Sequence, residues 1–464
     1  MLIDLSWATA LKSLACMALT LAAAFVPIPG LENSGPRICF VIFVTAAVLW
    51  VTELIPAYAT SIMVIVLCVY LLGRPEGPLN LQRSGEQSWE MFLNPIASPV
   101  LALFFGSFIL AIGATKHGFD VRLARAFITP FGKRPKMLLM GVIGTTALFS
   151  MFMSNTATTA MMIAIAGPLF QQLGGGRDGL KKMLVLAIPF SASIGGLGTI
   201  IGTPPNAVAA SVLHHLGSQY EVTFLKWMMI GVPVVIVLLF ALWVILLLVF
   251  RPRPEPVEIQ FPELLEVTPE LATVVLTFTV TILMWLTQPL HDIPSAVVAL
   301  LPIAVFSAFG IIDAGDLKRL DWDILILVAG GLTLGVAMSA SGLSEIIVRR
   351  IPFETLPRLL IITSIMIVGL ILSNFMSNAA ASNLIIPIVC SISALETRLG
   401  ALAVAFACSL AMSLPISTPP NAIAFATRAV TTQEMAKYGT LVSVIGLIVL
   451  LTVFFTLGDV ISAF

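Results

Sequence analysis

Long apolar runs separated by short polar segments dominate the chain. Most of these runs approach the length of about 20 residues that an α-helix needs to cross a bilayer, and none shows the period-two alternation of a barrel strand. Because lipid offers the backbone no hydrogen-bond partners, the spanning segments have to be helices. The pattern predicts an all-α polytopic membrane protein with eleven transmembrane helices, over residues 8–28, 38–53, 57–73, 96–118, 183–213, 226–250, 268–287, 293–312, 323–344, 397–427 and 438–460.

Two further apolar segments carry polar residues at their centres. Residues 137–172 contain Ser154-Asn155-Thr156, and residues 359–395 contain Ser377-Asn378-Ala379. We call these tripeptides the first knot and the second knot. Each segment either crosses the membrane twice or forms a re-entrant hairpin with its knot at the tip, and the number of crossings alone does not separate these readings.

A helix-breaking motif follows each knot, inside a predicted span. Residues 183–213 contain Gly202-Thr203-Pro204-Pro205-Asn206, and residues 397–427 contain Ser417-Thr418-Pro419-Pro420-Asn421. Two prolines remove two backbone donors, so the helix must break there. Broken helices at membrane depth are tolerated where they line a cavity, and their free backbone groups can hold ions. One such motif is also compatible with a simple proline kink, but two copies, each paired with a knot, favour a binding site.

The two halves of the chain resemble each other. Gly106 and Gly118 have the same spacing as Gly330 and Gly342, and Trp50…Pro56 recurs loosely as Trp285…Pro294. We therefore expect an N-terminal helix over residues 1–37, a first repeat over 38–250, a polar linker over 251–267 and a second repeat over 268–464. Each repeat contains one hairpin segment and one broken helix.

Basic residues orient the chain in the membrane. When the crossings are counted, 16 of the 24 Lys and Arg residues fall on one face, and such an excess marks the cytoplasmic side. The N-terminus is then cytoplasmic, and the two knot segments enter from opposite faces, as an inverted repeat requires. The 16 residues are Lys12, Lys116, Arg122, Arg125, Lys133, Arg134, Lys136, Arg177, Lys181, Lys182, Arg251, Arg253, Lys318, Arg319, Arg428 and Lys437.

Within this basic face, residues 119–136 mix apolar and charged side chains. They form either an amphipathic helix at the cytoplasmic interface or a plain basic loop.

The amino-acid composition indicates a membrane protein and argues against nucleic-acid binding and metal binding. The chain is 58% hydrophobic and 10% charged, whereas soluble proteins carry about 25% charged residues. Its formal net charge is zero, so it does not suggest a nucleic-acid partner. The five cysteines stand singly in apolar runs and indicate neither a metal site nor a disulfide framework. Because neither a nucleotide-binding or hydrolase motif nor a paired catalytic group is evident, we expect no enzyme activity.

The knots offer neutral oxygen atoms: serine hydroxyls, asparagine amides and the Thr156 hydroxyl. Such oxygens suit a hard cation such as Na⁺, although they also commonly bond one helix to another. Neither knot and neither helix-breaking motif contains Lys, Arg, Asp or Glu. An anion bound there would need positive charge from bound Na⁺ and from helix N-termini, so we expect it to bind only after the cations.

The paired Ser-Asn knots and the paired Thr-Pro-Pro-Asn breaks resemble the divalent anion/sodium symporter family of Na⁺-coupled di- and tricarboxylate transporters. The resemblance extends from the WVTELIP stretch that begins at Trp50 to the last predicted span. It implies two re-entrant hairpins with the knots at their tips, a fixed scaffold and a moving elevator-type domain, and a homodimer in the bacterial inner membrane. The implied function is Na⁺-driven symport of small dianions, foremost C4 dicarboxylates such as succinate, malate or fumarate. A citrate or sulfate carrier, or a dicarboxylate antiporter of the same fold, is the alternative.

The same resemblance assigns site residues, motif by motif. It places the first Na⁺ site at Ser150, Ser154, Asn155 and Gly202, and the second at Ser373, Met376 through its carbonyl, Asn378 and Ser417. The substrate carboxylates would contact Asn155, Thr156, Thr203, Asn378, Thr418 and Pro419. Ala379 occupies the position where the family carries threonine, which removes one hydroxyl donor from the second knot.

Overall fold

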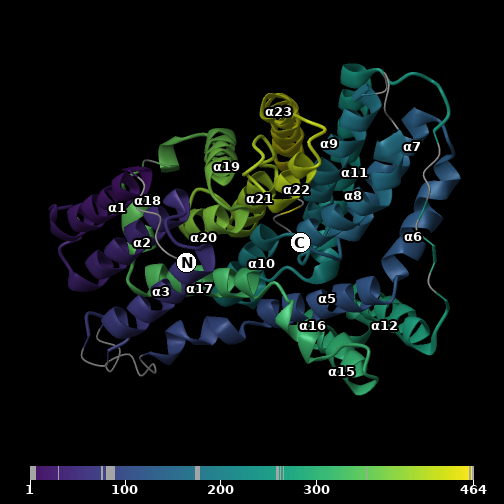
Figure 1. Cartoon of the computed structure of the whole chain (residues 1–464). Helices are drawn as coiled ribbons and strands as arrows, with labels where there is room; N and C mark the ends of the chain where they lie inside the picture. The colour runs from purple at the N-terminus through teal and green to yellow at the C-terminus, as the bar shows by residue number, and fades with distance from the viewer. Residues whose placement is uncertain are drawn as a thin grey trace.

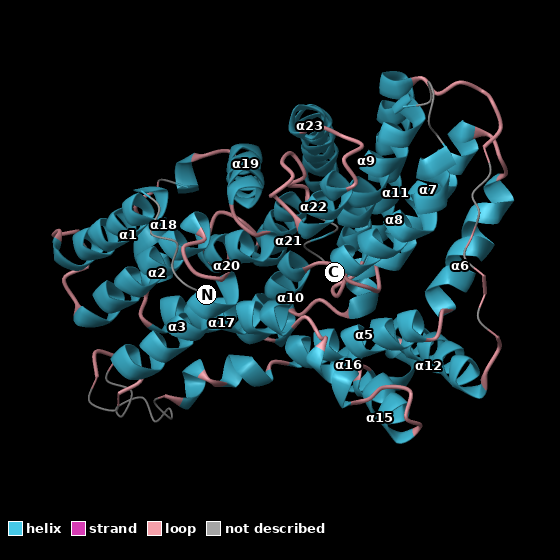
Figure 2. Cartoon of the chain, viewed as in Figure 1, coloured by secondary structure: helices cyan, strands magenta, loops and turns pink. Residues whose placement is uncertain are grey.

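The computed structural model describes residues 7–458 and Ile461, apart from Gly30 and residues 75–76, 80–88, 173–177, 258–260, 262, 265 and 352. Within these described parts the chain forms helices joined by loops (Figure 2). The first half contains α1 (Trp7–Phe25), α2 (Ser34–Thr52), α3 (Ala57–Leu67), α5 (Pro99–Lys116), α6 (Phe119–Ile128), α7 (Pro135–Ser150), α8 (Asn155–Gln172), α9 (Asp178–Gly195), α10 (Pro204–Leu216) and α11 (Phe224–Phe250).

The second half begins at α12 (Pro269–Leu286) and runs to α23 (Thr432–Thr456) (Figure 1). Between them lie α13 (Gln288–His291), α14 (Ser295–Val298), α15 (Leu300–Ala308), α16 (Ala314–Lys318), α17 (Trp322–Ala340), α18 (Leu343–Val348), α19 (Arg358–Phe375), α20 (Asn378–Val389), α21 (Thr397–Ser409) and α22 (Pro419–Ala426).

Eight helices in the described parts are long and apolar enough to cross a membrane. Several remaining predicted spans are helices with local interruptions. The span at 57–73 is α3 continued by a π-helical turn, Cys68–Leu72, and the span at 293–312 is divided at Ala299 into α14 and α15. The outer surface is apolar where a bilayer would touch it: Ile236, Phe240 and Leu248 of α11 are all exposed. The chain is therefore an integral membrane protein built from helices.

The order of elements in the first half recurs in the second. The series α2, α3, α5, α6, α7–α8, α9–α10 and α11 is followed by α12, α14–α15, α17, α18, α19–α20, α21–α22 and α23. Corresponding helices also pack in corresponding ways. Helix α5 lies against α14 and α15, while its counterpart α17 lies against α3. Helix α10 packs on α20 and α21, while its counterpart α22 packs on α8 and α9. Helices of each half therefore pack against helices of the other half.

Two pairs of residues that suggested the repeat have matching local structure, one pair in a hydrogen bond and the other in its backbone conformation. The Trp50 indole donates to the carbonyl of Ala57 (3.1 Å) and the Trp285 indole to that of Ser295 (3.0 Å), in both cases the residue after the proline that starts the next helix. Gly118 and Gly342 both have positive φ, at 66° and 73°, and precede α6 and α18. The halves therefore share a local design as well as an order of elements.

Gly106 and Gly330 lie at two close helix crossings. A Cβ atom on Gly106 would lie 2.0 Å from the carbonyl oxygen of Ala299, and one on Gly330 would lie 2.3 Å from the Cβ atom of Ser61. Real Cβ atoms are not found at such distances, so glycine is required at both crossings. These contacts join α5 to the α14–α15 junction and α17 to α3, which are the same pair of elements in the two repeats.

The segment 119–136 begins with a helix rather than a loop. Helix α6 buries Asp120, Ala124 and Ile128, three positions on one face at helical spacing. The first part of this segment is therefore a helix with one buried face, as one of the two readings predicts, and its place at the cytoplasmic interface stays a prediction.

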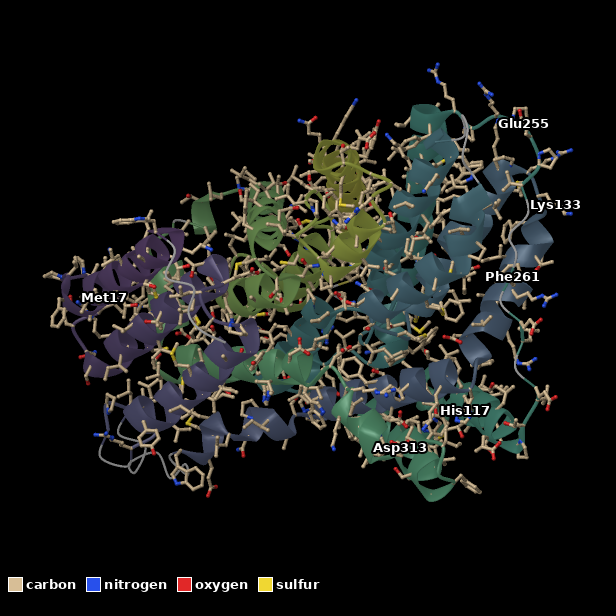
Figure 3. The ribbon with its side chains drawn as sticks, viewed as in Figure 1. Met17, His117, Lys133, Glu255, Phe261 and Asp313 are labelled. Carbon is tan, nitrogen blue, oxygen red and sulfur yellow. The ribbon has the colours of Figure 1, made fainter. Side chains whose placement is uncertain are left out.

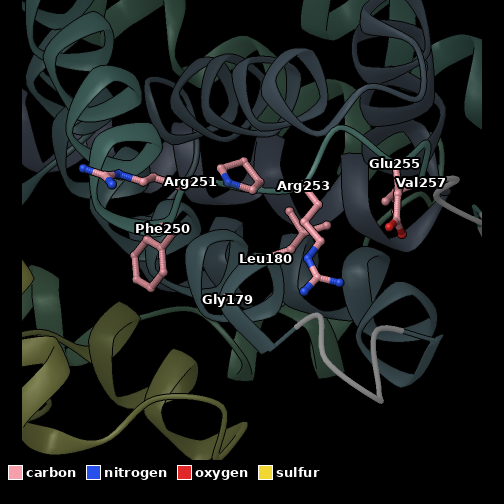
Figure 4. Close-up of a pocket in the computed structure, with 8 residues that line it drawn as sticks. Gly179, Leu180, Phe250, Arg251, Arg253, Glu255 and Val257 are labelled. Atoms are coloured by element: carbon pink, nitrogen blue, oxygen red, sulfur yellow. The ribbon is translucent and has the colours of Figure 1, made fainter.

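The polar linker after α11 lies along the loop that follows α6. The amide of Val257 donates to the carbonyl of Lys133 (2.8 Å), and Figure 3 shows Glu255 in the same region. Where the linker begins, a small cavity of about 140 Å³ is lined by Arg251 and Arg253 together with Gly179 and Leu180 of α9 (Figure 4). The linker therefore connects the halves while resting on the first.

Candidate functional site

Both knots form the turn between two helical arms, as the sequence predicts. The chain turns between α7 and α8, and the Ser154 hydroxyl accepts a hydrogen bond from the amide of Ala157 (3.2 Å). It turns again between α19 and α20, where Ser377 accepts from the amide of Ala380 over the same distance. Such a serine satisfies one free amide at the start of a helix. Asn155 and Asn378 are consequently the first residues of α8 and α20.

Both Thr-Pro-Pro-Asn motifs interrupt a helix, and the asparagine of each holds the interrupted loop together. After α9 and a 3₁₀ turn (Gly196–Gly198), α10 starts at Pro204, and the Asn206 amide donates to the carbonyls of Gly196 (2.9 Å) and Thr199 (2.7 Å). After α21, α22 starts at Pro419, and the Asn421 amide donates to the carbonyls of Met412 (3.0 Å) and Leu414 (2.9 Å). These two asparagines brace the loops.

The first knot meets the first broken helix at Asn155. One terminal atom of the Asn155 amide lies 3.1 Å from the carbonyl oxygen of Ala192, 3.1 Å from that of Gly202, and in hydrogen-bonding contact with the Ser150 hydroxyl. Nitrogen at this position would donate to both carbonyls. Because its neighbours are oxygen atoms, nitrogen is the atom that satisfies them, and it closes a hydrogen-bond cluster. With the amide turned, the side-chain oxygen would join the two carbonyls and the Ser150 hydroxyl, a donor set of the kind that binds hard cations.

The backbone around Asn155 leaves no room for larger residues. A Cβ atom on Gly196 would lie 2.8 Å from Asn155 Oδ1, and one on Gly202 would lie 2.4 Å from the carbonyl oxygen of Gly196. Three of the predicted first-site residues, Ser150, Asn155 and Gly202, are therefore together. Ser154 is the fourth, and its hydroxyl caps α8. Ala192 and Gly196 also lie at this cluster, and the sequence analysis did not single them out, although serine and glycine are frequent in the stretch 191–198.

More of the contacts around the second knot are made by side chains than around the first. The Ser373 hydroxyl lies 2.8 Å from Asn378 Oδ1 and 2.8 Å from the carbonyl oxygen of Cys408, at the end of α21. Ser417 instead contacts Asn374, with its hydroxyl 3.2 Å from Asn374 Oδ1. The same oxygen of Asn374 accepts from the amide of Ser413 (3.1 Å). Asn374 therefore holds the second loop against α19.

Asn374 is a residue that the sequence reasoning missed. Its signal was its place beside Ser373, in a stretch of polar residues around the second knot. Met376, predicted to bind Na⁺ through its carbonyl, has an extended backbone at the end of α19 and a buried side chain. The predicted second-site residues thus fall into two groups: Ser373 with Asn378, and Ser417 with Asn374.

The residues predicted to contact substrate carboxylates lie at the starts of helices. Thr156 is half-buried in the first turn of α8, and Ala379 is buried in the first turn of α20. Thr203 and Thr418 precede α10 and α22, and Pro419 is exposed. The Thr203 hydroxyl lies 3.4 Å from that of Ser409, so the first motif reaches α21 of the other half. Partial positive charge at helix starts favours bound anions.

A cavity of about 350 Å³ lies beside the first knot. Ser154 and Ala157 line it from α8, residues of α5 line it opposite, and Asp316, Arg319 and Asp321 line it from the segment before α17. Lys116, also in its wall, forms ion pairs with Asp316 (2.5 Å) and Asp313 (3.1 Å). Fixed charges therefore approach the first knot from distant parts of the chain, although none lies within the knot itself.

Asp321 is the charged residue in this wall that engages the knot. Burial raises the pKa of its carboxyl group, the neighbouring Asp323 raises it further, and a hydrogen bond from Ser154 lowers it. Sequence reasoning did not single out Asp321, because nothing local connects it to a serine so far away in the chain.

Comparisons with known proteins cover nearly the whole chain. The family described as "Sodium:sulfate symporter transmembrane region" matches residues 7–463. A protein of Staphylococcus saprophyticus named sodium-dependent dicarboxylate transporter SdcS is 30% identical, over 92% of this chain and 87% of its own. An uncharacterised transporter of Haemophilus influenzae is 32% identical, over 88% of each chain.

Solved structures share the fold at low sequence identity. The YdaH transporter of Alcanivorax borkumensis aligns with a TM-score of 0.58 and 12% identity, over 86% of this chain and 97% of its own. MtrF of Neisseria gonorrhoeae aligns with a TM-score of 0.57 and 13% identity, over 88% of this chain and 96% of its own. Both are similar to this chain in architecture alone.

Proposed function

The chain belongs to the sodium:sulfate symporter family, and we propose that within it this protein imports small dianions, foremost C4 dicarboxylates such as succinate, malate or fumarate, together with Na⁺. Na⁺ is the coupling ion. The observation that carries the proposal is the convergence of the Ala192 and Gly202 carbonyls and the Ser150 hydroxyl at the Asn155 amide, together with relatives named for sodium-dependent dicarboxylate transport.

The site residues have separate roles in this proposal. Ser150, Ser154, Asn155 and Gly202 bind one Na⁺, with Ala192 contributing a further carbonyl. Ser373, Met376, Asn378 and Ser417 bind a second, with Asn374 positioning Ser417. The substrate carboxylates lie between the knots, at Asn155, Thr156, Thr203, Asn378, Thr418 and Pro419, next to Ala379. The neutral side chains leave bound Na⁺ as the main source of positive charge.

The transport step follows an elevator mechanism in this proposal. One body holds the knots and broken helices, and it slides against a scaffold that includes α2, α3, α5, α12, α15 and α17. The repeats are inverted in the membrane, the N-terminus is cytoplasmic, and the protein works as a homodimer in the bacterial inner membrane. The matching contacts of the two halves, described above, support this division.

Uptake into proteoliposomes tests the proposal. Labelled succinate, citrate and sulfate are offered separately, each with an inward Na⁺ gradient and with choline in its place. We expect succinate to accumulate only with the Na⁺ gradient. Accumulation of sulfate or citrate alone would transfer the proposal to that anion, and succinate exchange that needs internal dicarboxylate but no Na⁺ would overturn symport in favour of antiport.

A further inference from the structure

Helix α8 contains two fully buried threonines, Thr158 and Thr159, about one turn after the first knot. Threonines in the helices of this chain commonly donate to the carbonyl four residues earlier, as Thr146 does to that of Val142 (2.6 Å). Within the described parts, the hydroxyls of Thr158 and Thr159 make neither this bond nor another. Both hydroxyls therefore remain available to a partner outside the protein chain.

Helix α22 contributes a third buried oxygen of this kind. Asn421 is fully buried, and its amide nitrogen donates to the carbonyls of Met412 and Leu414. Its side-chain oxygen Oδ1 has no hydrogen-bond partner among the described residues. Buried polar atoms are nearly always paired in native proteins, and a bound ion or water accounts for many of those that the protein itself leaves unpaired.

The two helices that carry these oxygens are neighbours and run in the same direction. Helix α22 packs against α8. Helix α8 leads into α9 and α22 leads into α23, and an ion pair between Lys182 and Glu434 joins the first turns of α9 and α23. The C-terminal ends of α8 and α22 therefore lie toward one face of the protein, and their N-terminal ends lie together at the knot.

The ion pair also allows the depth of the threonines to be measured. The Asn155 amide contacts the carbonyl of Ala192, which is ten residues from Lys182 along α9, or about 15 Å. Thr158 and Thr159 follow Asn155 by three and four residues as α8 returns toward the start of α9. They therefore lie about 10 Å from the level of Lys182.

The same measurement on the other side of the ion pair gives the depth of Asn421. Its amide donates to the carbonyl of Met412, and a Cβ atom on Gly439 of α23 would lie 2.1 Å from that carbonyl oxygen. Gly439 is five residues from Glu434, or about 8 Å. The two depths agree within the length of a lysine side chain, so the three unpaired oxygens lie at one level of the α8–α22 contact.

The second repeat does not reproduce this set of oxygens. Aligning the knots makes Ala381 and Ser382 of α20 the counterparts of the two threonines. Ala381 has no hydroxyl, and the Ser382 hydroxyl donates to the carbonyl of Ala379 (2.8 Å). Asn206, the counterpart of the α22 asparagine, also has an unpaired Oδ1, but no pair of unpaired hydroxyls accompanies it. The set therefore belongs to one repeat and is not a general consequence of the fold.

We infer that Thr158, Thr159 and Asn421 bind a further coupling Na⁺, about one helical turn from the Asn155 cluster and separate from the ions at the two knots. Hydroxyl and amide oxygens are neutral ligands of the kind that a hard cation accepts. The inference rests on the proposed function, in which a dianion binds where the knots contain no fixed positive charge. A further cation beside the knot supplies part of that charge.

Counting the Na⁺ ions bound to the purified protein tests the site. Valine has the shape of threonine without the hydroxyl, so Thr158→Val/Thr159→Val should bind one radiolabelled Na⁺ fewer per chain at saturation, and Thr158→Ser/Thr159→Ser should restore it. The matched control Thr146→Val removes a buried hydroxyl that is already bonded within α7, and it should bind as many ions as the unmodified chain. If the double valine variant does not fold, each single valine variant should weaken the binding of one ion by roughly tenfold.

The inference and the proposed function fail in different ways. An unchanged Na⁺ count in the folded valine variant would overturn the inference and assign these oxygens to buried water. One Na⁺ fewer in that variant, in a protein that moves no succinate, would leave the site standing and refute the proposed function.

A second measurement tests the coupling of this ion in proteoliposomes. The membrane potential at which net succinate flux stops, under fixed gradients, gives the number of Na⁺ ions per succinate. This number should fall by one in the valine variant and stay constant in Thr146→Val. An unchanged number in the valine variant would contradict the inference.

Discussion

The two knots have nearly the same sequence but different surroundings. Around the first knot, backbone carbonyls of Ala192 and Gly202 converge on Asn155, and every residue from 196 to 203 is buried. Around the second knot, hydroxyl and amide side chains make most of the contacts that carbonyls make around the first. The tip of the second hairpin is also more exposed, since Phe375 and Ile416 are 64% and 83% exposed. A motif therefore fixes the position of an asparagine at a helix start, while the residues that complete its site come from elsewhere.

This difference has a physical basis in the loops. The first loop carries Gly198 and Gly202 where the second carries Ser413 and Ser417. Glycine lets backbone approach backbone closely, so carbonyls can serve as ligands. Serine keeps the backbones apart and substitutes its own hydroxyl. We expect the first site to be more rigid and the second to depend more on individual side chains.

The largest expected effect comes from removing either knot asparagine. A hydrogen bond or contact to a charged group contributes roughly 1.5–3 kcal/mol, so Asn155→Ala and Asn378→Ala should each weaken Na⁺ binding by roughly tenfold or more. The Na⁺ concentration that gives half-maximal succinate uptake measures the Na⁺ affinity of each variant. If Asn155→Ala weakens Na⁺ binding and Asn378→Ala does not, the second knot holds no cation, and the knots form one Na⁺ site in place of two.

A smaller and one-sided effect is expected at Asn374. Asn374→Ala removes the side-chain oxygen that accepts from the Ser413 amide and contacts the Ser417 hydroxyl, and leaving a buried group without a partner costs about 1–3 kcal/mol. The Ser417 hydroxyl keeps its contact with the backbone carbonyl of residue 374 (3.3 Å). Because Ser417 is buried but Asn374 is partly exposed, we expect the lower part of this range, or roughly a fivefold loss of Na⁺ affinity.

The first half provides the control for Asn374. Its counterpart is Met151, whose carbonyl, not its side chain, accepts from Thr199. Met151→Leu should therefore leave Na⁺ affinity unchanged. Equal losses in Asn374→Ala and Met151→Leu would indicate general damage to the hairpins in place of a specific role for Asn374.

An effect of comparable or smaller size, but of opposite sign, tests the one sequence difference within the knots. Ala379→Thr restores a hydroxyl that Thr156 has and Ala379 lacks, and a neutral hydrogen bond contributes about 0.5–1.5 kcal/mol. Succinate affinity should rise roughly two- to tenfold, with little gain for a monocarboxylate, and Thr156→Ala should give a loss of similar size. Because Ala379 is only 4% exposed, the gain requires the new hydroxyl to turn toward the substrate.

An unchanged affinity in Ala379→Thr together with complete loss in Thr156→Ala would have a clear meaning. Position 379 would not face the substrate, and the first hairpin would dominate the site.

Much of the fold follows from the sequence because it depends on local chemistry. Apolar runs of spanning length have to be helices in lipid, prolines at 204–205 and 419–420 have to interrupt them, and Ser154 and Ser377 are suited to start the next helix. Two of the glycines that predicted the repeat, Gly106 and Gly330, lie at close crossings that admit no larger residue.

The rest of the site depends on contacts between distant residues. Ala192 contributes a carbonyl, which every residue possesses, so its side chain carries no information about that role. Asp321 reaches Ser154 only through the packing of two halves. Asn206 and Asn421 were expected within binding motifs. Their side-chain amides donate to backbone carbonyls of the loops before them, and these bonds depend on how the loops fold back.

Anion binding depends on Na⁺ in this proposal, because the knots contain no fixed cation. Titration calorimetry of the purified protein with succinate, in NaCl and in choline chloride of equal ionic strength, tests it most directly. We expect succinate affinity to fall by roughly tenfold or more without Na⁺, and Na⁺ affinity to rise by the same factor with succinate, since linkage is reciprocal. A succinate affinity that is equally tight in both salts would show that the anion binds without Na⁺.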